Sequence, residues 1–431
     1  MGYAKGKEIM SSRTFRWGAL LPTALIGLVT ACDTEVINPG RVQEEFLLRE
    51  EAQEAIVAGI GRAVSEAQNW VGYTSAAITR EIHPSGSTGS FGITVRWQNG
   101  ELRDDEVGTQ WSNSQRARWL GDDAIAKIQE TGATSNDLLA EAYLWTGYAY
   151  RLLGENFCEA VIDGSAAMNR SEYYTRAIER FTQAATLGSG DMAMAAVAGR
   201  ASVRAFMGDW AGAVTDASSV PDGFSFMLPY FDTEGDDTRN RIQFASHAQP
   251  YKAHTQRFTK YETYGLSDNN PAGDPRIPFR ITTETGDAAV QCCGQVDWWP
   301  QDKYQEPGAD IELSSSEEMR LIEAEALLEG NDFPGAMTII NSLRSAAGQP
   351  DATASDITEA WTALKFERGV ELWLEGRRLG DFFRWDRDGT PGDLDPLETA
   401  SGDQLTGSHL VQQDLCFPIS EGEKDTNPNI S

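Results

Sequence analysis

Three segments of the chain repeat one order of small, aromatic and turn-forming residues, and this repeat constrains the fold more than any other feature. The turns of these segments are Gly154-Glu155, Gly208-Asp209 and Asn331-Asp332, and alanines, glycines and aromatic residues flank each of them. A small residue allows two helices to cross closely, and a Gly-acid or Asn-acid pair ends one helix and begins the next. The repeat therefore predicts helical hairpins.

The hairpin pattern resembles that of tetratricopeptide repeats, in which each helix pair buries its apolar face against the next pair. Residues 174–187 supply a second helix that completes the first hairpin. We expect a mainly α fold: a tetratricopeptide-like helical-hairpin scaffold with long irregular loop insertions and few short strands. The scaffold is expected at about 42–69, 116–217 and 316–385.

Two stretches, at about 70–115 and 221–307, interrupt the helical pattern with Gly, Pro, Asp and Asn residues. The second stretch also holds a strand-like piece at 241–244. Loops of this length are either functional or disordered, and their many aromatic residues argue against disorder. We therefore expect the ligand to bind in these two stretches.

Flat aromatic rings in loops are suited to stacking on a ligand. Neighbouring residues in an extended segment point in opposite directions, so at most one of Trp298 and Trp299 is expected to face the ligand. The candidate ligand-binding residues are Trp97, Trp298 and Trp299, with Trp70 and Tyr73 behind them.

The run at 366–385 concentrates acids, arginines and aromatics. Glu367, Glu371 and Glu375 recur every four residues and so line one face of a helix, which Gly376 allows to end. This composition fits either an internal ion-pair lattice or a catalytic pocket. We favour the lattice, because Arg forks pair with carboxylates and stack on aromatics, whereas a glycosidase needs two carboxylates on either side of a cleft. We therefore predict that the chain has no catalytic residues.

The chain is strongly acidic, with a formal net charge of -29 over 431 residues and a pI near 4.5. This charge repels nucleic acids and anionic membrane surfaces. Nucleic acid is therefore not expected as a partner, and contact with a membrane is expected through a lipid anchor only.

The amino terminus has the pattern of an export signal: a basic start and a short apolar stretch from Ala19 to Ala31, too short to span a bilayer. A basic segment remains if translation starts at Met10. Val29-Thr30-Ala31-Cys32 resembles the lipobox of bacterial lipoproteins, which implies cleavage before Cys32 and acylation of this cysteine. The expected parts are a signal peptide at 1–31, a flexible tether at 32–41 and a single domain at 42–431.

Four further cysteines suit disulfide bonds in an exported chain: Cys158, Cys292, Cys293 and Cys416. Four cysteines allow three pairings. A bond between neighbouring cysteines is strained, so we expect Cys292 and Cys293 each to pair with one of the two distant cysteines.

The sequence predicts no tightly bound metal and no cofactor. The four histidines are far apart in the sequence without zinc-ligand spacing, and no CxxC occurs. One acidic loop is a weaker candidate, but its spacing does not match an EF-hand and a solvated loop is expected. Its aspartates are Asp386, Asp388, Asp393 and Asp395.

Several motifs together resemble the SusD/RagB family of bacterial surface lipoproteins, over nearly the whole chain after Cys32. The most specific is the run at 366–385, with its Glu-Arg, Glu-Gly-x-Arg and Asp-x-x-Arg-Trp pieces. The four-cysteine set is not a general feature of the family, which leaves the loop structure open. Motifs that agree in order are the lipobox, Asp274-Pro275-Arg276, Lys303-Tyr304, Asn341-Ser342-Leu343-Arg344 and the terminal Phe417-Pro418-Ile419 and Asn427-Pro428-Asn429.

The resemblance implies a surface-exposed, lipid-anchored outer-membrane protein. Such a protein binds an oligosaccharide or a peptide and passes it to a TonB-dependent transporter of the SusC type, with the helices facing the transporter and the loops facing the ligand. The hairpins alone also suit an envelope scaffold lipoprotein that holds a protein partner. A glycoside hydrolase acting through Glu371 or Glu375 is a third hypothesis, and we expect no turnover.

Overall fold

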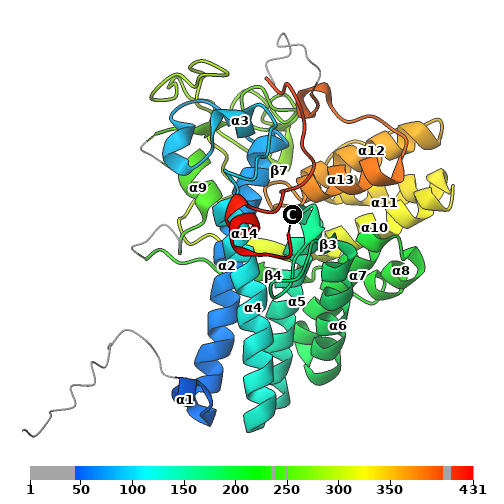
Figure 1. Cartoon of the computed structure of the whole chain (residues 1–431). Coiled ribbons are helices and arrows are strands. Elements are labelled where there is room, and N and C mark those ends of the chain that lie inside the picture. The colour runs from blue at the N-terminus through cyan, green and yellow to red at the C-terminus, as the bar shows by residue number, and fades with distance from the viewer. Residues whose placement is uncertain (1–43, 234–237, 249–250, 401–408, 431) are drawn as a thin grey trace, which may run out of the picture. The chain divides into compact units, whose positions relative to one another are not determined.

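Long helices packed side by side form the scaffold of the computed structural model, which describes residues 44–233, 238–248, 251–400 and 409–430. Figure 1 shows α2, α4, α5 and α6 running alongside one another, with α10 to α13 beside them on the right. The scaffold helices are α2 (Gln53–Ile78), α4 (Gly108–Thr131), α5 (Asn136–Asn156), α6 (Ser171–Leu187), α7 (Gly190–Met207), α8 (Trp210–Ala217), α10 (Ser316–Glu329), α11 (Phe333–Ala346), α12 (Ile357–Glu371) and α13 (Arg378–Asp388).

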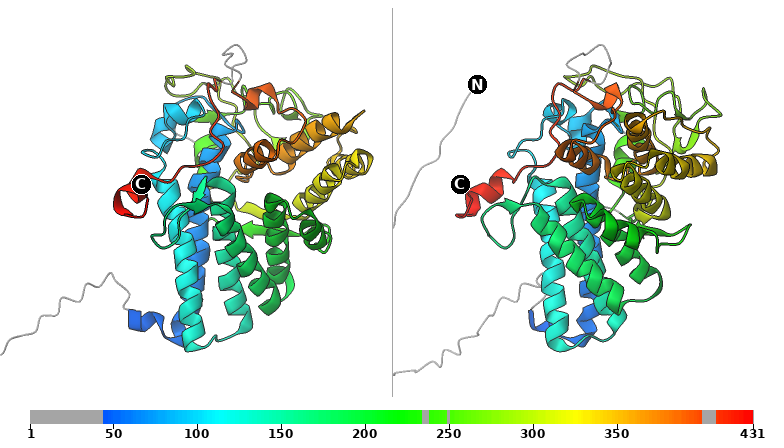
Figure 2. Two further views of the ribbon diagram at one scale, coloured as in Figure 1. Left: turned by 45° about the vertical axis from the view of Figure 1, so that its right-hand side comes forward. Right: turned by 90° about the vertical axis from the view of Figure 1, so that its right-hand side faces the viewer.

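Helices that follow one another in the sequence pack against one another, as a stack of hairpins requires. α4 packs on α5, α5 on α6, α6 on α7 and α7 on α8. The stack then continues, because α8 packs on α10 and α10 on α11. Figure 2 shows this succession from two further directions. The predicted mainly α, hairpin-based scaffold is therefore confirmed.

Two of the three predicted turns have the expected chemistry. Gly208, with φ of 79°, ends α7, and Asp209 caps α8 by accepting a hydrogen bond from the Gly212 amide at 3.1 Å. Asn331 and Asp332 do the same between α10 and α11. These acids are favoured at a helix start because their side-chain oxygens satisfy amides that lack a partner within the helix.

The turn predicted at Gly154-Glu155 is wrong. Both residues lie inside α5, and Gly154 is small because the Tyr174 ring of α6 packs directly on it. The first hairpin is instead formed by α5 and α6, and α6 contains the predicted stretch 174–187. Gly154 in the repeat pattern marks a close crossing of two helices and not a turn, because both structures need a residue without a side chain.

The predicted boundaries also needed correction. α2 continues to Ile78, beyond the expected end at 69, and α4 already begins at Gly108. Residues 241–244 belong to a short helix, because Asn240 accepts a hydrogen bond from the Gln243 amide at 3.0 Å and caps it. The short helices are α1 (Glu44–Leu47), η1 (Glu50–Ala52), η2 (Thr88–Phe91), α3 (Val95–Gln98), α9 (Arg241–Ser246), η3 (Pro396–Glu398) and α14 (Glu421–Thr426).

The described strands form small two-stranded ladders that hold the loops in place. β4 (Ser225–Leu228) pairs with β8 (Ile311–Ser315), so the two ends of the long insertion lie side by side. β1 (His83–Pro84) pairs with β5 (His254–Thr255), which ties the loop after α2 to the insertion. The other ladders are antiparallel β2 (Glu159–Ala160) with β3 (Met168–Asn169), and parallel β6 (Gly265–Leu266) with β7 (Asp274–Pro278).

The run at 366–385 forms a buried ion-pair lattice, as predicted. Arg368 donates to both carboxylate oxygens of Asp381, at 3.0 and 2.9 Å. Arg384 joins Asp381 to Glu325, and Arg378 binds Glu398 at 2.8 Å. These side chains are all at least nine-tenths buried, and breaking such a pair by removing one partner is costly because the other charge stays buried.

The lattice also brings together motifs that are far apart in the sequence. Arg276 of the Asp-Pro-Arg motif reaches Glu367 and Glu371 at 2.6 and 2.5 Å. Arg344 reaches Glu367 at 3.0 Å, and Lys303 contacts Glu375 at 2.7 Å.

The helical face predicted for the three glutamates is corrected at one position. α12 ends at Glu371, and Glu375 lies in the following turn, where Leu374 and Gly376 have positive φ. The three carboxylates are nevertheless all used in ion pairs, because the turn directs Glu375 to Lys303.

The predicted disulfide pairing is wrong. Cys158 pairs with Cys416, because the segments that carry them form backbone hydrogen bonds, with the Cys158 amide donating to Phe417 O at 2.9 Å. Cys292 pairs with its neighbour Cys293 in a turn in which the Cys293 and Gly294 amides both donate to Val290 O. All four predicted disulfide cysteines are therefore bonded, although in a pairing that the sequence argument rejected.

The predicted signal peptide, the lipidation at Cys32 and the tether lie outside the described residues. Residues from Gln43 onward cluster as one compact unit. Within the described part of the chain, no helix combines the length and the apolar character needed to cross a membrane.

Candidate functional site

Three of the five predicted ligand-binding aromatics are covered by protein. Trp97 of α3, Tyr73 of α2 and Trp298 of the insertion are 2%, 0% and 4% exposed. The structure does not support these three as a ligand platform, because packing inside the loop region already uses their rings. Such local packing is the commoner role of aromatics near turns.

Tyr73 has a defined structural partner. Its hydroxyl lies 3.2 Å from Nδ1 of His254, and the two rings meet edge to face. Burial lowers the pKa of His254 to about 3, so this imidazole is neutral at physiological pH. The pair joins α2 to β5 and thereby anchors the insertion on the scaffold.

Trp70 and Trp299 are the two half-buried candidates. The guanidinium of Arg241 lies over the Trp70 ring, 3.5 Å from its centroid, and so occupies one face of it. Trp299 is held by its backbone, since its amide donates to Thr255 Oγ1 at 2.8 Å. Of the two tryptophans at 298 and 299, Trp299 is the one that reaches the surface.

Trp299 belongs to a group of side chains that we call the aromatic surface, made up of Arg257, Phe258, Phe279 and Trp299. The Phe279 ring is buried and lies nearly parallel to that of Trp299, at 12° and 6.2 Å between centroids. The Arg257 guanidinium is 5.1 Å from the Trp299 centroid and 4.6 Å from that of Phe258. Rings supported from below are rigid platforms for stacking.

Charged groups lie next to the aromatic surface along the chain. Arg257 pairs with Glu262, and Arg280, which follows Phe279, pairs with Asp302 at 2.9 Å. Asp302 also lies 3.0 Å from Nδ1 of His247. Such groups can donate and accept hydrogen bonds beside a stacked ring. The sequence argument missed Arg257 and Phe279, because only pairing across the insertion brings them to Trp299. It also missed Asp302, whose partners Arg280 and His247 come from other parts of the insertion.

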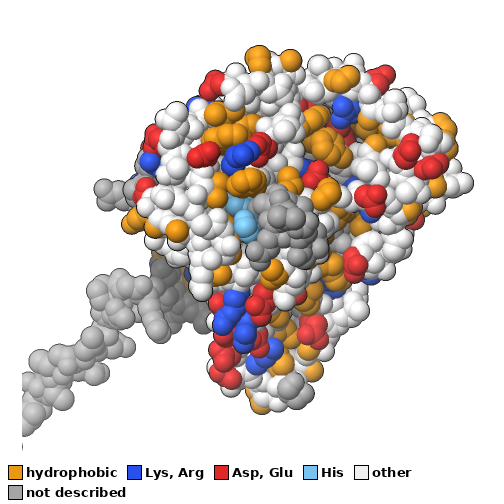
Figure 3. Space-filling model, turned by 90° about the horizontal axis from the view of Figure 1, so that it is seen from above, with side chains coloured by type: hydrophobic (Ala, Val, Ile, Leu, Met, Phe, Trp, Pro, Cys, Tyr) orange, Lys and Arg blue, Asp and Glu red, His pale blue; other side chains and the backbone are white. Residues whose placement is uncertain are grey.

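The loop-rich end of the molecule carries mixed chemistry. Figure 3 views the molecule from this end and shows hydrophobic side chains in several small groups, with acidic, basic and histidine side chains between them. Such a mixture suits a ligand that offers both apolar faces and hydrogen-bonding groups.

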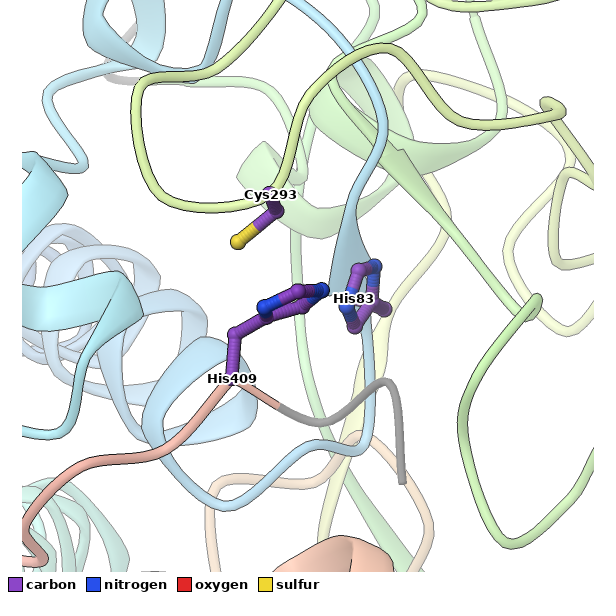
Figure 4. Close-up of side chains that lie close together, drawn as sticks. All are labelled: His83, Cys293 and His409. Atoms are coloured by element: carbon purple, nitrogen blue, oxygen red, sulfur yellow. The ribbon is translucent and has the colours of Figure 1, made fainter. Parts of the chain in front are cut away.

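Two histidines and a cysteine from three distant segments meet near the aromatic surface. The possible ligand atoms of His83, Cys293 and His409 all lie within 4.8 Å of one another, and Figure 4 shows the sulfur of Cys293 near the two imidazoles. Because a thiolate is the form that binds metal, the disulfide with Cys292 removes Cys293 as a ligand in this state. Sequence spacing missed this group, and the absence of a tightly bound metal stays a prediction.

The described residues contain a further pocket, of about 280 Å³, beside the ion-pair lattice. Arg276, Glu312, Glu317 and Glu371 line it. Burial raises the pKa of Glu371 to about 7 and raises that of Glu312 as well. Arg276 forms an ion pair with Glu371 at 2.5 Å, so part of the negative charge that lines this pocket is already balanced within the protein.

Comparison with known proteins agrees with the motifs of the ion-pair lattice. Residues 318–431, which include most of the lattice, match the model of the SusD family. The carboxyl-terminal part of the chain is therefore similar to the SusD family. No curated protein matches the sequence.

Solved structures of the SusD superfamily share the fold of the chain at low sequence identity. A protein from Parabacteroides distasonis has a TM-score of 0.65 at 14% identity, covering 91% of this chain and 99% of its own. One from Bacteroides vulgatus has a TM-score of 0.64 at 15% identity, covering 89% and 98%. Surface glycan-binding protein A from Bacteroides uniformis has a TM-score of 0.61 at 13% identity, covering 87% and 98%.

Proposed function

We propose that this protein is a member of the SusD family that binds an oligosaccharide at the aromatic surface and does not catalyse a reaction. The observation that carries the proposal is the half-buried Trp299, which reaches the surface, is supported by the buried Phe279 ring and has the Arg257 guanidinium over its ring. A sugar ring offers an apolar face for stacking and hydroxyls for the neighbouring Arg and Asp groups. A structural neighbour described as a surface glycan-binding protein supports the same ligand class.

The cellular role follows from the resemblance of the motifs. We infer that the chain is acylated at Cys32, sits on the outer face of the outer membrane and delivers its ligand to a TonB-dependent transporter of the SusC type. A gene for such a transporter next to the gene for this chain would support this part. A neighbourhood that lacks one favours the alternative of an envelope scaffold.

Glycan binding can be tested on protein that begins after Cys32. Neutral and acidic oligosaccharides and peptides are screened by isothermal titration calorimetry, and the best ligand is then tested on Trp299→Ala. We expect at least a tenfold weaker affinity, about 1.4 kcal/mol, because the variant loses the stacking face.

Trp119→Ala is the matched control, since Trp119 is 51% exposed on α4, in the scaffold. It should bind as the unchanged protein does. Equal affinities of the unchanged protein and Trp299→Ala would show that the ligand binds elsewhere. If only peptides bind in the screen, the proposed ligand class is wrong and the ligand is a peptide.

A further inference from the structure

A second pocket opens at the amino-terminal end of α6, within the helical scaffold. It has a volume of about 210 Å³. This is smaller than the roughly 300–1,000 Å³ of pockets for drug-sized ligands, so it suits a small ion or one charged group of a larger molecule. Its lining residues are Cys158, Asn169, Arg170, Ser171, Tyr174, Met207, Phe383 and Arg387.

Arg170 is a buried cation for which the described residues supply no counter-ion. Its side chain is 5% exposed and donates through Nε to Phe157 O at 2.6 Å, while Nη1 is buried without any partner. Its guanidinium lies over the Phe383 ring, 3.6 Å from the centroid. None of the ion pairs among the described residues involves Arg170. A buried charge in this condition is costly, and an anion would relieve the cost.

Tyr174 contributes a second donor without a partner. Its ring is 1% exposed and packs on Gly154 of α5, and its hydroxyl is buried with no hydrogen bond. Most buried hydroxyls have a partner, so one without calls for an explanation. Arg170 and Tyr174 lie one helical turn apart and line the same pocket.

Two further features favour an anion. Arg387 adds a second guanidinium at the exposed edge of the pocket, where it also donates to Phe206 O at 2.8 Å and pairs with Asp388. The pocket lies at the start of a helix of 17 residues, and helix starts attract negative charge. The N-cap residue, Arg170, supplies no side-chain cap, and the Ser171 amide donates to Asn169 Oδ1 at 2.9 Å.

We propose that this pocket binds a small oxyanion, either free sulfate or phosphate or the carboxylate or sulfate group of an acidic sugar. The oxyanion would accept hydrogen bonds from Arg170 Nη1 and from the Tyr174 hydroxyl and would balance the charge of Arg170. Both donors are covered by protein, so the half-buried Phe383 ring or the exposed Met207 side chain moves aside for the anion to enter. The site is separate from the aromatic surface and does not depend on glycan binding there.

Calorimetry on the purified protein at constant ionic strength tests the proposal with sulfate, phosphate, glucuronate and glucose. We expect saturable binding of at least one anion with a dissociation constant on the order of 1 mM and no binding of glucose. Binding of sulfate or phosphate alone identifies a free anion as the ligand, and binding of glucuronate identifies the acidic group of a sugar. The absence of any saturable anion binding overturns the proposal.

Arg387→Gln should weaken anion binding at least fivefold, because it removes a charge from the edge of the pocket. Arg176→Gln removes the same charge from α6 outside the pocket and should leave the affinity unchanged. Equal affinities for the Arg387→Gln variant and the unchanged protein, or equal losses in both variants, would contradict the site.

The Tyr174→Phe variant tests whether the Tyr174 hydroxyl binds the anion or has a structural role. Removing a buried hydroxyl without a partner should raise the melting temperature in anion-free buffer, yet it should weaken anion binding. A variant that is destabilised without anion would show that the hydroxyl has a structural partner and would argue against the site.

Discussion

Most buried charges in this protein are neutralised by a direct partner, and the exceptions are informative. Glu81 is fully buried, and one of its oxygens accepts a hydrogen bond from the Leu374 amide at 2.8 Å. The other oxygen has no partner, and no ion pair among the described residues includes this carboxylate. Burial therefore raises the pKa of Glu81 to about 7.

The raised pKa of Glu81 predicts a pH-dependent stability. Between the unfolded pKa of about 4.5 and the folded pKa of about 7, the folded state holds a proton that the unfolded state has lost. The free energy of unfolding should therefore fall as pH rises through this window, by at most about 1.4 kcal/mol per pH unit from this group.

Urea unfolding of the unchanged protein and of Glu81→Gln between pH 5 and pH 8 measures this effect. Glutamine keeps the acceptor for the Leu374 amide and cannot ionise, so its stability relative to glutamate should rise up to about pH 7 and then level off. Glu54→Gln, on the exposed side of α2, controls for the loss of a surface charge. A stability difference that is constant across the pH range would show that Glu81 is not responsible.

At the scale of elements, glycines set how closely the scaffold helices approach one another. Gly147 and Gly154 face α6 from within α5, and a side chain at either position would meet an aromatic ring. The ring that Gly147 meets is that of Phe181, and Gly199 of α7 meets the same ring. The spacing of the hairpin stack therefore depends on missing side chains, which explains why a small residue recurs in the sequence pattern.

Gly147→Ala should destabilise the protein by about 1–3 kcal/mol, although alanine is the better helix former. Its Cβ would lie 2.7 Å from Phe181, a distance that forces the helices apart. Gly59→Ala in α2 is the matched control, because nothing lies within 4 Å of the added atom, and it should stabilise by about 0.5–1 kcal/mol. Thermal and urea unfolding measure the stability of both variants. If both substitutions destabilise the protein, the contact with Phe181 is not the cause of the effect at Gly147.

At the scale of the whole molecule, long-range links hold the irregular segments against the helices. The pairing of β4 with β8 closes the insertion, and the bond between Cys158 and Cys416 ties the end of α5 to the carboxyl-terminal segment across 258 residues. Cys292 and Cys293 close no such loop. The two disulfides should therefore differ strongly in their contribution to stability.

Replacing Cys158 and Cys416 by serine should lower the free energy of unfolding by about 2–5 kcal/mol, because the open chain gains conformational entropy on unfolding. The same replacement of Cys292 and Cys293 should have a much smaller effect. Mass spectrometry of peptides from the unreduced protein should recover Cys158 linked to Cys416. A peptide that links Cys158 or Cys416 to Cys292 or Cys293 would contradict the pairing.

Features that depend on residues close together in the sequence could be predicted, and features that depend on distant segments could not. Helix periodicity, the caps Asp209 and Asp332 and the pairing chemistry of the run at 366–385 are properties of neighbouring residues, so the hairpins and the ion-pair lattice were predictable. The aromatic candidates were chosen from loops by composition. Composition does not distinguish a tryptophan that fills a gap, such as Trp97, from one that reaches the surface, such as Trp299.

The sequence by itself determined that this chain forms helical hairpins with aromatic loops and a charged carboxyl-terminal run. Only the tertiary structure decided which cation meets which carboxylate, which cysteines pair, and that His83 lies beside His409. The physical reason is that each of these contacts joins segments whose approach depends on the packing of the whole domain. Arg170 and Tyr174 belong to both levels, since one helical turn sets their spacing while the surrounding fold leaves Arg170 Nη1 and the Tyr174 hydroxyl without a hydrogen-bond partner.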